Sequence, residues 1–512
     1  MKKLIVALTA IILLASCNNI TQNLLNPNTS QFKEYADSLD EQKMKEYLQA
    51  IIQNDTVRWT VDKVVKQRYD SIMGVDDKCA LWFDEDGVSA DVDTLLHFMR
   101  SELPKHGLNQ ERFYLSEIEK DLDVVEKLAF DSVGRDINEV LVHLDYHLSK
   151  AYARYMVGMQ YGFTLPDKMM NRLYYRSDRG YWAHLFDYEI EKPDYEKLWQ
   201  TLQSADRVKA MENLAPANAQ PYRQLQTQLS KTSDKDQRRK LLVNMERCRW
   251  RIQHPKLEDR GVLVNLPAQQ LWTLGKSLNM SMKVCCGAWD TKTPLLSSLI
   301  SYMQVNPEWS LPPKIVASDF VRHVGDSAWF ARHKYFVVDR KTSDTLNIAS
   351  LGASGMKNQR LRFVQRGGAG NSLGRIVFRF DSKFSIYLHD TNTPGVFGRD
   401  RRTVSHGCIR VEKPFDLACY LLPELTDWDK DRLRISMDIA PQTERGMKYV
   451  KSHANSRRPF RLFDFHRVTP KVPVYIVYYT AYPNPQTGVV EYWPDIYAYD
   501  NAIAENMGKM IE

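Results

Sequence analysis

The stretch 384–411, FSIYLHDTNTPGVFGRDRRTVSHGCIRV, joins a strand pattern to side chains that carry chemistry. Residues 384–388 are rich in aromatic and β-branched types, so they predict a β-strand that ends at His389. A connection of fifteen residues follows, and Ser-His-Gly-Cys then occupies 405–408. The stretch therefore places a histidine at the end of a predicted strand and, after the connection, a cysteine next to a glycine.

Segments on both sides of this stretch carry the same strand signals. They are short, rich in β-branched and aromatic residues, and bounded by Gly, Pro, Asn or Asp. They are GVLVNLPAQQLWTL (261–274), LNMSMKVCCG (278–287), SLISYMQV (298–305), GRIVFRF (374–380) and VPVYIVYYTAY (472–482). A more mixed, polar segment at 314–366 interrupts them and is a candidate lid over a site, or a surface insertion with a small core of its own.

Before about residue 255 the pattern is helical. Segment 111–163 has apolar residues at spacings of three and four, which is typical of amphipathic helices. Its two stripes are Leu115, Ile118, Leu122, Val125 and Leu128, then Ile137, Val140, Leu141 and Leu144. Residues 194–215 and 222–250 predict further helices, separated by Pro216 and Pro221. We therefore expect an α+β protein with a helical domain at 31–255, a mainly β domain at 256–500 and a C-terminal tail at 501–512.

The cysteine of this stretch has the neighbours that nucleophilic acyl transfer requires. That chemistry needs a thiolate, a base or cation to generate it, and hydrogen-bond donors for the oxyanion. A free cysteine has a pKa of about 8.5, which nearby cations lower. Arg399, Arg401, Arg402 and Arg410 lie close to Cys408 in the sequence, together with two histidines. The sequence thus offers each of the required components.

Each residue also has a simpler explanation when it is taken alone. Cys408 would be a small buried hydrophobic residue, His389 a hydrogen-bonded residue at a strand end, and the arginines a solvated loop. The His-x-Cys pair and the distant histidine suggest zinc, but the sequence offers no convincing fourth ligand and no CxxC pair. Only the combination is specific.

Taken together, these residues resemble the signature of the L,D-transpeptidases with a YkuD-type catalytic domain. Further blocks resemble the larger, multi-domain periplasmic (YcbB-like) members of that family, and NMERCRWR (244–251) extends the likeness into the helical half. The blocks are VNPEWSLPP (305–313), LGRIVFRF (373–380), IYLHDT (386–391), SHGCIRVEKPFDLA (405–418), VPVYIVYYTAY (472–482) and DIYAYD (495–500). The resemblance implies a β-sandwich-like catalytic domain, which agrees with the strand pattern.

The resemblance also implies roles for individual residues. Cys408 would be the nucleophile and His389 the general base, while His406 would shape the pocket and support the oxyanion site. The amides of Gly407 and Cys408 would donate hydrogen bonds to the oxyanion. Whether Asp390, which follows the base, orients the imidazole cannot be read from the sequence. No metal or organic cofactor is implied.

Substrate contacts are expected from Tyr387, Ser405 and Arg410. Tyr387 would share a strand face with His389 and line the donor groove, and Arg410, with the arginines at 399–402, would hold the thiolate or a substrate carboxylate. The implied substrates are peptidoglycan stem peptides, a tetrapeptide donor and an amine acceptor. The product would be a 3→3 crosslink; water as acceptor would give L,D-carboxypeptidase activity, and a D-amino acid would give exchange.

Two departures from the family pattern affect this interpretation. The common motif has Asn two residues after the cysteine, whereas this chain has Arg410, as the larger members do. Larger relatives often carry a small peptidoglycan-binding domain within the helical half, and the stretch 205–245 is too short for one. The helical half is then expected to serve as a scaffold.

The N-terminal sequence predicts that the protein is located in the cell envelope. MKKLIVALTAIILLASC (1–17) has two lysines and then thirteen uncharged residues, about 20 Å of helix, which is short of a membrane span. Its end resembles a bacterial lipobox, so we expect a signal peptide at 1–16, lipidation at Cys17 and a polar tether at 17–30. An ordinary secretory signal with an incidental cysteine is the alternative. The mature protein would be anchored to a membrane and face the periplasm, where cell-wall synthases are candidate partners.

Composition narrows the classes of protein that remain. The 512 residues are 43% hydrophobic and 26% charged, which excludes intrinsic disorder and a polytopic membrane protein. Seven cysteines are too few for a disulfide scaffold, and a net charge of +7 is too dilute to indicate nucleic acid. The alternatives to a transpeptidase are a catalytically silent wall-binding lipoprotein and a cysteine peptidase of another fold. The intact set at His389 and 405–408 argues against a silent lipoprotein. The order of the residues, with His before Cys, argues against a cysteine peptidase of another fold.

Overall fold

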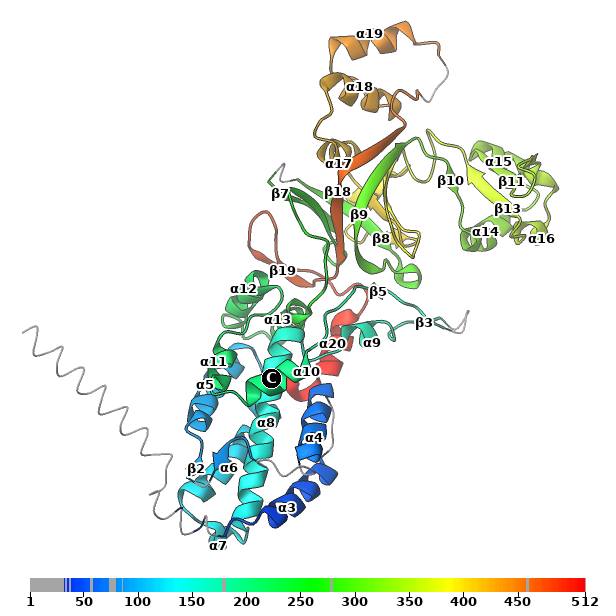
Figure 1. Cartoon of the computed structure of the whole chain (residues 1–512). Helices are drawn as coiled ribbons and strands as arrows, with labels where there is room; N and C mark the ends of the chain where they lie inside the picture. Colours follow the sequence, from blue (N-terminus) through cyan, green and yellow to red (C-terminus); the bar gives the residue numbers. More distant parts are fainter. Residues whose placement is uncertain are drawn as a thin grey trace, which may run out of the picture.

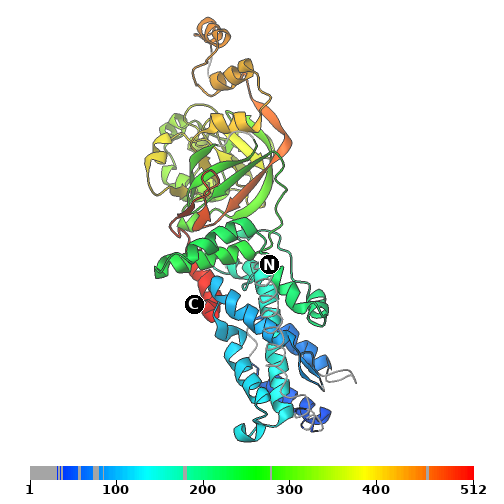
Figure 2. The ribbon, with the colours of Figure 1, turned by 90° about the vertical axis from the view of Figure 1, so that its left-hand side faces the viewer.

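The computed structural model describes residues 32, 35, 38–55, 59–72, 80–84, 86–176, 181–276, 280–456 and 460–511. The expected signal peptide, the tether and Cys17 therefore lie outside the described residues. A helical region occupies one end of an elongated molecule and leads into a β domain with two outgrowths (Figures 1 and 2). Among the described residues, no helix combines the length and the apolarity that a membrane crossing requires.

The helical region is built around one long, buried helix, α8 (Ile137–Tyr161). Asp136 caps it by accepting from the Asn138 N–H at 2.7 Å, and the apolar residues at 137, 140, 141 and 144 are buried as their spacing predicts. The elements around and before it are α3 (Glu41–Asn54), α4 (Thr60–Ile72), β1 (Phe83–Asp84), β2 (Gly87–Val88), α5 (Asp91–Lys105), α6 (Leu115–Glu126) and α7 (Phe130–Val133). The two apolar stripes predicted in 111–163 thus correspond to α6 and α8, and the short α7 lies between them.

Two ion pairs lock the polar side of α8 to its neighbours. Arg154 makes a two-pronged contact with Asp62 of α4 at 2.7 and 2.8 Å, and Lys150 contacts Asp55 at 2.6 Å. Arg154, Asp62 and Lys150 are each at most 5% exposed. Because a buried charge without its partner costs about 3–5 kcal/mol, these pairs hold the bundle in one arrangement.

The rest of the helical region packs against the β domain. It contains α9 (Pro166–Met170), β3 (Tyr175–Arg176), β4 (Tyr181–Trp182), β5 (Phe186–Asp187), α10 (Tyr195–Leu202), α11 (Arg207–Glu212), α12 (Ala219–Leu229) and α13 (Lys235–Arg249). The stretch 222–250 is two helices, and Asp234 caps the second by accepting from the Gln237 N–H at 2.8 Å. The charged residues after 230 are therefore a short connection followed by a helix entry.

The β domain is a sheet that closes on itself. Its strand order is β14-β15-β17-β8-β7-β6-β18-β9, with β5 at the end, and β14 also pairs with β9. The strands are β6 (Arg260–Asn265), β7 (Gln270–Gly275), β8 (Ser281–Gly287), β9 (Leu295–Val305), β14 (Ile376–Phe380), β15 (Leu388–His389), β16 (Thr403–Ser405), β17 (Ile409–Val411) and β18 (Phe465–Val477). Closure leaves few free edges and encloses an apolar core that includes Val262, Met303, Phe378 and Ile409. The α+β class is as predicted, and β6 to β9, β14 and β18 coincide with predicted strand segments. The strand predicted at 384–388 is wrong except at its end: only Leu388 belongs to β15, because the chain turns before it, with φ of 51° at Ser385.

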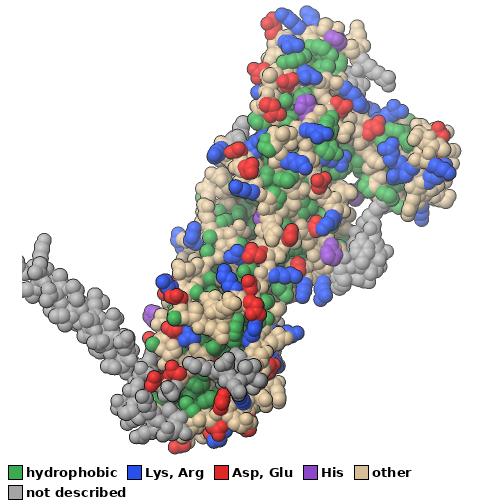
Figure 3. All heavy atoms as spheres, in the orientation of Figure 1, with side chains coloured by type: hydrophobic (Ala, Val, Ile, Leu, Met, Phe, Trp, Pro, Cys, Tyr) green, Lys and Arg blue, Asp and Glu red, His purple; other side chains and the backbone are tan. Residues whose placement is uncertain are grey.

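The mixed segment near 314–366 forms an outgrowth with its own sheet, in the order β10-β13-β11-β12. It contains β10 (Trp309–Ser310), α14 (Pro313–Asp319), α15 (Ser327–Arg332), β11 (Tyr335–Asp339), β12 (Thr345–Leu346), α16 (Ala353–Met356) and β13 (Leu361–Gln365). Phe320, Phe330, Val337 and Phe363 belong to its own core. Residues 307–371 contain ten Lys and Arg but only five Asp and Glu, so this insertion carries most of the net positive charge of the chain (Figure 3).

The chain ends by returning to the helical region. A second outgrowth, with α17 (Pro414–Leu421), α18 (Asp427–Ser436) and α19 (Glu444–Ser452), precedes β18. After β19 (Ala481–Pro483) and β20 (Val490–Tyr492), helix α20 (Tyr499–Met507) packs on α9 and α13. Ile503 and Met507 are fully buried, and Asp500 pairs with Arg247 of α13 at 2.7 Å. Residues 501–511 are thus no tail, contrary to the prediction from the sequence: they help to join the two halves.

Candidate active site

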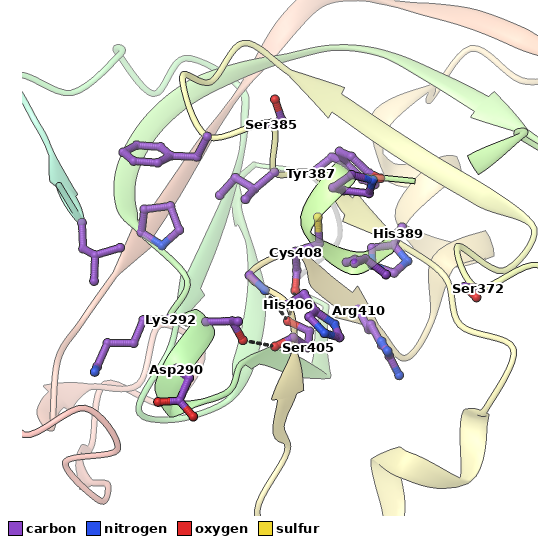
Figure 4. Close-up of a pocket in the computed structure, with 18 of the residues that line it drawn as sticks. Asp290, Lys292, Ser372, Ser385, Tyr387, His389, Ser405, His406, Cys408 and Arg410 are labelled. Atoms are coloured by element: carbon purple, nitrogen blue, oxygen red, sulfur yellow. Dashed lines mark hydrogen bonds between the residues drawn. The ribbon is translucent and has the colours of Figure 1, made fainter. Parts of the chain in front are cut away.

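Two parallel strands bring the histidine and the cysteine together. β15 pairs with β17 so that His389 lies opposite Arg410, and the Ile409 N–H donates to the Tyr387 carbonyl at 3.1 Å. Cys408 immediately precedes β17, so this pairing places it beside the strand that ends at His389. Figure 4 shows both residues at the same pocket.

The pocket is a cavity of about 360 Å³ to which distant parts of the chain contribute. The helical region supplies residues 174, 183 and 185, and the segment after β8 supplies 290–292 and 294. The charged insertion supplies Trp309, Pro312 and Ile315 to the wall, which makes it a neighbour of the site. All seven residues that the sequence proposes for the site line this cavity: Tyr387, His389, Ser405, His406, Gly407, Cys408 and Arg410.

The turn that presents the cysteine is held by its own serine. The Ser405 hydroxyl donates to the Cys408 carbonyl at 2.5 Å and accepts from the Gly407 N–H at 3.1 Å. Gly407 has φ of 114°, a conformation that side-chain-bearing residues rarely adopt. Ser405 is buried and its hydroxyl is engaged within the turn, so its first role is to stabilise the turn rather than to bind a substrate. The structure thus explains both the serine and the glycine by backbone geometry.

The hydrogen bonds of this turn revise the expected oxyanion site. The Gly407 N–H is already engaged by Ser405, whereas the Cys408 N–H has no acceptor within the described ranges. Two donors were expected, and this conformation leaves only the Cys408 amide available. His406 is exposed at the cavity, where its ring can contact a bound substrate.

Burial keeps the cysteine and the histidine neutral. Desolvation raises the pKa of the Cys408 thiol, although hydrogen bonds from Tyr387 and the charges of Arg379 and Arg410 act in the opposite direction. Desolvation, assisted by Arg410, lowers the pKa of His389 to about 3. Its Nδ1 is buried and has no hydrogen-bond partner in the part of the chain that the structure describes. Near pH 7 the site therefore holds a thiol and an imidazole that can accept a proton.

Asp390 follows the histidine, but its carboxylate is engaged elsewhere. Its carboxylate accepts from the Arg375 N–H at 2.7 Å and lies against Gly374, where an added Cβ would stand 2.4 Å from the carboxyl carbon. Asp390 therefore fixes the turn before β14. The question that the sequence leaves open about this carboxylate is answered by these contacts.

The arginines near the cysteine have different roles. Arg402 is buried and donates to the carbonyls of Val284 and Gln269 at 3.1 and 3.0 Å, which makes it structural. Arg399 and Arg401 are exposed and are not among the cavity-lining residues. Arg410 lines the cavity, and within the described ranges its Nε has no hydrogen-bond partner and no carboxylate lies within 4 Å of it. Of the arginines expected here, Arg410 is the one placed to meet a substrate.

The donor set at the cavity does not resemble a metal centre. Over the described ranges, no group of three or more His, Cys, Asp and Glu side chains is arranged to hold a metal ion. The cysteine and histidines are instead spread along a wall that also contains aromatic and apolar residues. This geometry suits an organic substrate better than a cation.

Comparison with known proteins agrees with this geometry. Residues 259–431 match the model of the YkuD family, described as the L,D-transpeptidase catalytic domain. The chain carries an L,D-transpeptidase catalytic domain. Residues 76–229 match a second model, described as a scaffold domain. A Haemophilus influenzae (strain KW20/Rd) protein named "Putative L,D-transpeptidase" is 26% identical over 359 residues, which cover 68% of each chain.

The cavity also contains a lysine that the sequence did not reveal. Lys292 is 7% exposed and its Nζ lies 3.8 Å from the ring centre of Trp289 and 4.1 Å from that of Tyr174. Nζ donates to the Trp289 carbonyl at 3.1 Å, and burial lowers the pKa of Lys292 to about 8. In Figure 4 it lies on the other side of Cys408 from His389. No motif in the segment that follows β8 (288–294) indicates this lysine.

Proposed function

We propose that this protein is a peptidoglycan L,D-transpeptidase that forms 3→3 crosslinks through a thioester on Cys408. The observation that carries the proposal is the convergence of Cys408, His389, Tyr387 and Arg410 on one cavity, in a domain of the L,D-transpeptidase family. That family acts on peptidoglycan stem peptides. The positively charged insertion beside the cavity suits a substrate that carries several carboxylates.

In the first half of the reaction, Cys408 Sγ attacks the carbonyl carbon of the donor's third residue. His389 takes the thiol proton as the S–C bond forms, so that charge develops on the carbonyl oxygen opposite the Cys408 N–H. The C–N bond to the terminal D-alanine then breaks, and His389 returns the proton to the leaving amine. The result is a thioester and free D-alanine.

In the second half, the amine of a neighbouring stem's third residue attacks the thioester. His389 accepts a proton from that amine, the C–S bond breaks, and the proton returns to the sulfur. The same intermediate gives L,D-carboxypeptidase activity with water and exchange with a small D-amino acid. The acceptor, not the nucleophile, separates these reactions.

The proposal is tested by giving the purified protein a disaccharide tetrapeptide and analysing the products by mass spectrometry. We expect free D-alanine and a dimer whose fragmentation places the new amide between two third residues. Tripeptide monomer alone would identify the carboxypeptidase, and incorporation of an added D-amino acid the exchange enzyme. No turnover by folded protein would contradict the proposal and favour a catalytically silent wall-binding lipoprotein.

We also propose that the protein acts at a bacterial membrane, facing the periplasm, through a lipid on Cys17. The support is the sequence of residues 1–17, in which a short apolar run ends at Leu-Ala-Ser-Cys. Metabolic labelling with a fatty-acid analogue should mark the wild type and spare Cys17→Ala. Equal labelling of both would contradict lipidation at this residue.

Lys292 is expected to bind a carboxylate of the donor stem. Because Lys292→Met keeps much of the side chain's length and apolar burial, it should raise KM for the tetrapeptide about tenfold or more, with kcat nearly unchanged. KM of the wild type should also rise as the pH passes about 8, where Lys292 loses its charge, and the variant should lack this rise. Steady-state kinetics between pH 6 and 9 measure both.

The control for Lys292 is Lys276→Met, because the Lys276 side chain is 89% exposed and contributes nothing to the cavity. This control should leave KM unchanged. A KM of Lys292→Met equal to that of the wild type over the pH range would show that the lysine only packs between its aromatic neighbours.

A further inference from the structure

The peptide group between Gly407 and Cys408 is held by a residue outside the motif. The Thr293 hydroxyl donates to the Gly407 carbonyl at 2.9 Å. In a trans peptide the C=O and N–H point in opposite directions, so fixing this carbonyl also fixes the direction of the Cys408 N–H. Hydrogen bonding at the carbonyl additionally polarises the group and strengthens its N–H as a donor. This N–H is the oxyanion donor that the turn leaves available.

Thr293 is itself held by a closed set of hydrogen bonds. Its Oγ1 accepts from the Gly287 N–H at 2.8 Å, and its own N–H donates to the Tyr497 hydroxyl at 3.2 Å. The Tyr497 hydroxyl in turn donates to the Gly287 carbonyl at 2.7 Å. Thr293 is fully buried and Tyr497 is 3% exposed, so water does not compete for these bonds. The threonine hydroxyl therefore has one direction in which to donate.

Tyr497 belongs to the DIYAYD block, which links the catalytic domain to the helical region. Its N–H donates to the Tyr478 hydroxyl at 2.8 Å, and that hydroxyl donates to the Asp495 carboxylate. The Asp495 carboxylate also accepts from the Asp500 N–H at 2.9 Å. Asp500 pairs with Arg247, which lies in the NMERCRWR block of α13. Three blocks outside the catalytic motif, NMERCRWR, VPVYIVYYTAY and DIYAYD, thus form one continuous support.

We propose that Thr293 and Tyr497 are positioning residues that aim the Cys408 N–H at the oxyanion. Thr293 acts on the peptide group directly, and Tyr497 acts through Thr293, braced by the contact between the C-terminal segment and α13. The inference rests on the proposed function, because it concerns the oxyanion of Cys408 acylation. It also gives the helical region a part in catalysis: it braces the turn that carries the nucleophile.

The test separates chemistry from binding in full-length protein. A carbapenem presents a strained lactam carbonyl to the cysteine, and intact mass against time at several concentrations gives the saturating acylation rate and the dissociation constant. Thr293→Val, which keeps the shape and loses the hydroxyl, should slow saturating acylation about tenfold or more, with the dissociation constant within about twofold. Tyr497→Phe should slow saturating acylation about threefold or more. Thr293→Ser keeps the hydroxyl that Thr293→Val lacks, so it should retain most of the wild-type rate.

Tyr499→Phe is the matched control. Tyr499 is as buried as Tyr497 and its ring lies 5.7 Å away, but within the described ranges its hydroxyl has no hydrogen-bond partner. It should acylate like the wild type. Thermal denaturation of each variant shows whether it is folded, and if Thr293→Val fails to fold, Tyr497→Phe and Thr293→Ser carry the test.

Three results would overturn the inference. They are a normal saturating rate in folded Thr293→Val and Tyr497→Phe, a change confined to the dissociation constant, or an equal loss in Tyr499→Phe. Each of these leaves the proposed function intact, since the wild type still forms the adduct. An absence of any adduct on folded wild-type protein would instead remove the proposed function, and this inference with it.

Discussion

Cys408→Ala is expected to abolish covalent trapping by a carbapenem and to lower turnover of a tetrapeptide donor by about 10⁴-fold or more. The reason is that every proposed reaction of the site, crosslinking, hydrolysis or exchange, passes through the Cys408 thioester. Cys408 is only partly exposed, and the Ser405 hydrogen bonds that hold its turn involve backbone atoms that alanine keeps, so the alanine variant should fold normally. Intact mass after incubation shows the adduct, and product analysis gives the turnover.

The control for this prediction is another accessible cysteine. Cys419 is partly exposed, as Cys408 is, but lines a different cavity together with Lys413, Phe415 and Lys430. Cys419→Ala should form the adduct at the wild-type rate. An adduct that persists in Cys408→Ala, or one that disappears in Cys419→Ala, would mean that the nucleophile has been assigned incorrectly. A folded wild type that never forms an adduct would favour the catalytically silent lipoprotein.

The sequence could predict that these residues share one cavity because most of them lie close together along the chain. His389 ends the two-residue strand β15, and Cys408 lies in a glycine turn directly before β17, which pairs with β15. The hydrogen bonds of Ser405 span two and three residues, so a local motif contains them. Strand and helix patterns were equally local, which is why the α+β class and most elements follow from periodicity alone.

The parts of the site that the sequence did not show are made by distant contacts. Thr293 is 114 residues from the carbonyl it holds and 204 residues from Tyr497, and nothing in their local patterns indicates either contact. The structural role of Arg402 could not be predicted either. Only the fold shows that its guanidinium is buried and donates to backbone carbonyls. The C-terminal segment looked like a tail because its apolar residues find their partners only on the helical region.

His389→Gln is expected to slow carbapenem acylation by about 10²–10⁴-fold, because glutamine keeps a similar size but cannot accept the thiol proton. His466→Gln is the matched control. The Nδ1 of His466 is also buried and has no partner within the described ranges, but its ring stacks on Phe463 and does not line the cavity. It should react like the wild type. Equal rates in His389→Gln and the wild type would remove His389 as the base.

The pH dependence of acylation tests how that base works. The pKa of His389 is lowered to about 3, so the imidazole is neutral and able to accept a proton at every pH well above that value. Burial raises the pKa of the Cys408 thiol, so the thiol keeps its proton through neutral pH. A neutral pair predicts a saturating acylation rate that changes by less than about twofold between pH 5 and 8. A thiolate–imidazolium pair would instead require a lowered pKa of Cys408 and a raised pKa of His389. A plot of its acylation rate against pH would show an inflection at the pH where either group titrates. An inflection near the ordinary histidine pKa of about 6.5 would therefore contradict the neutral pair while leaving Cys408 as the nucleophile.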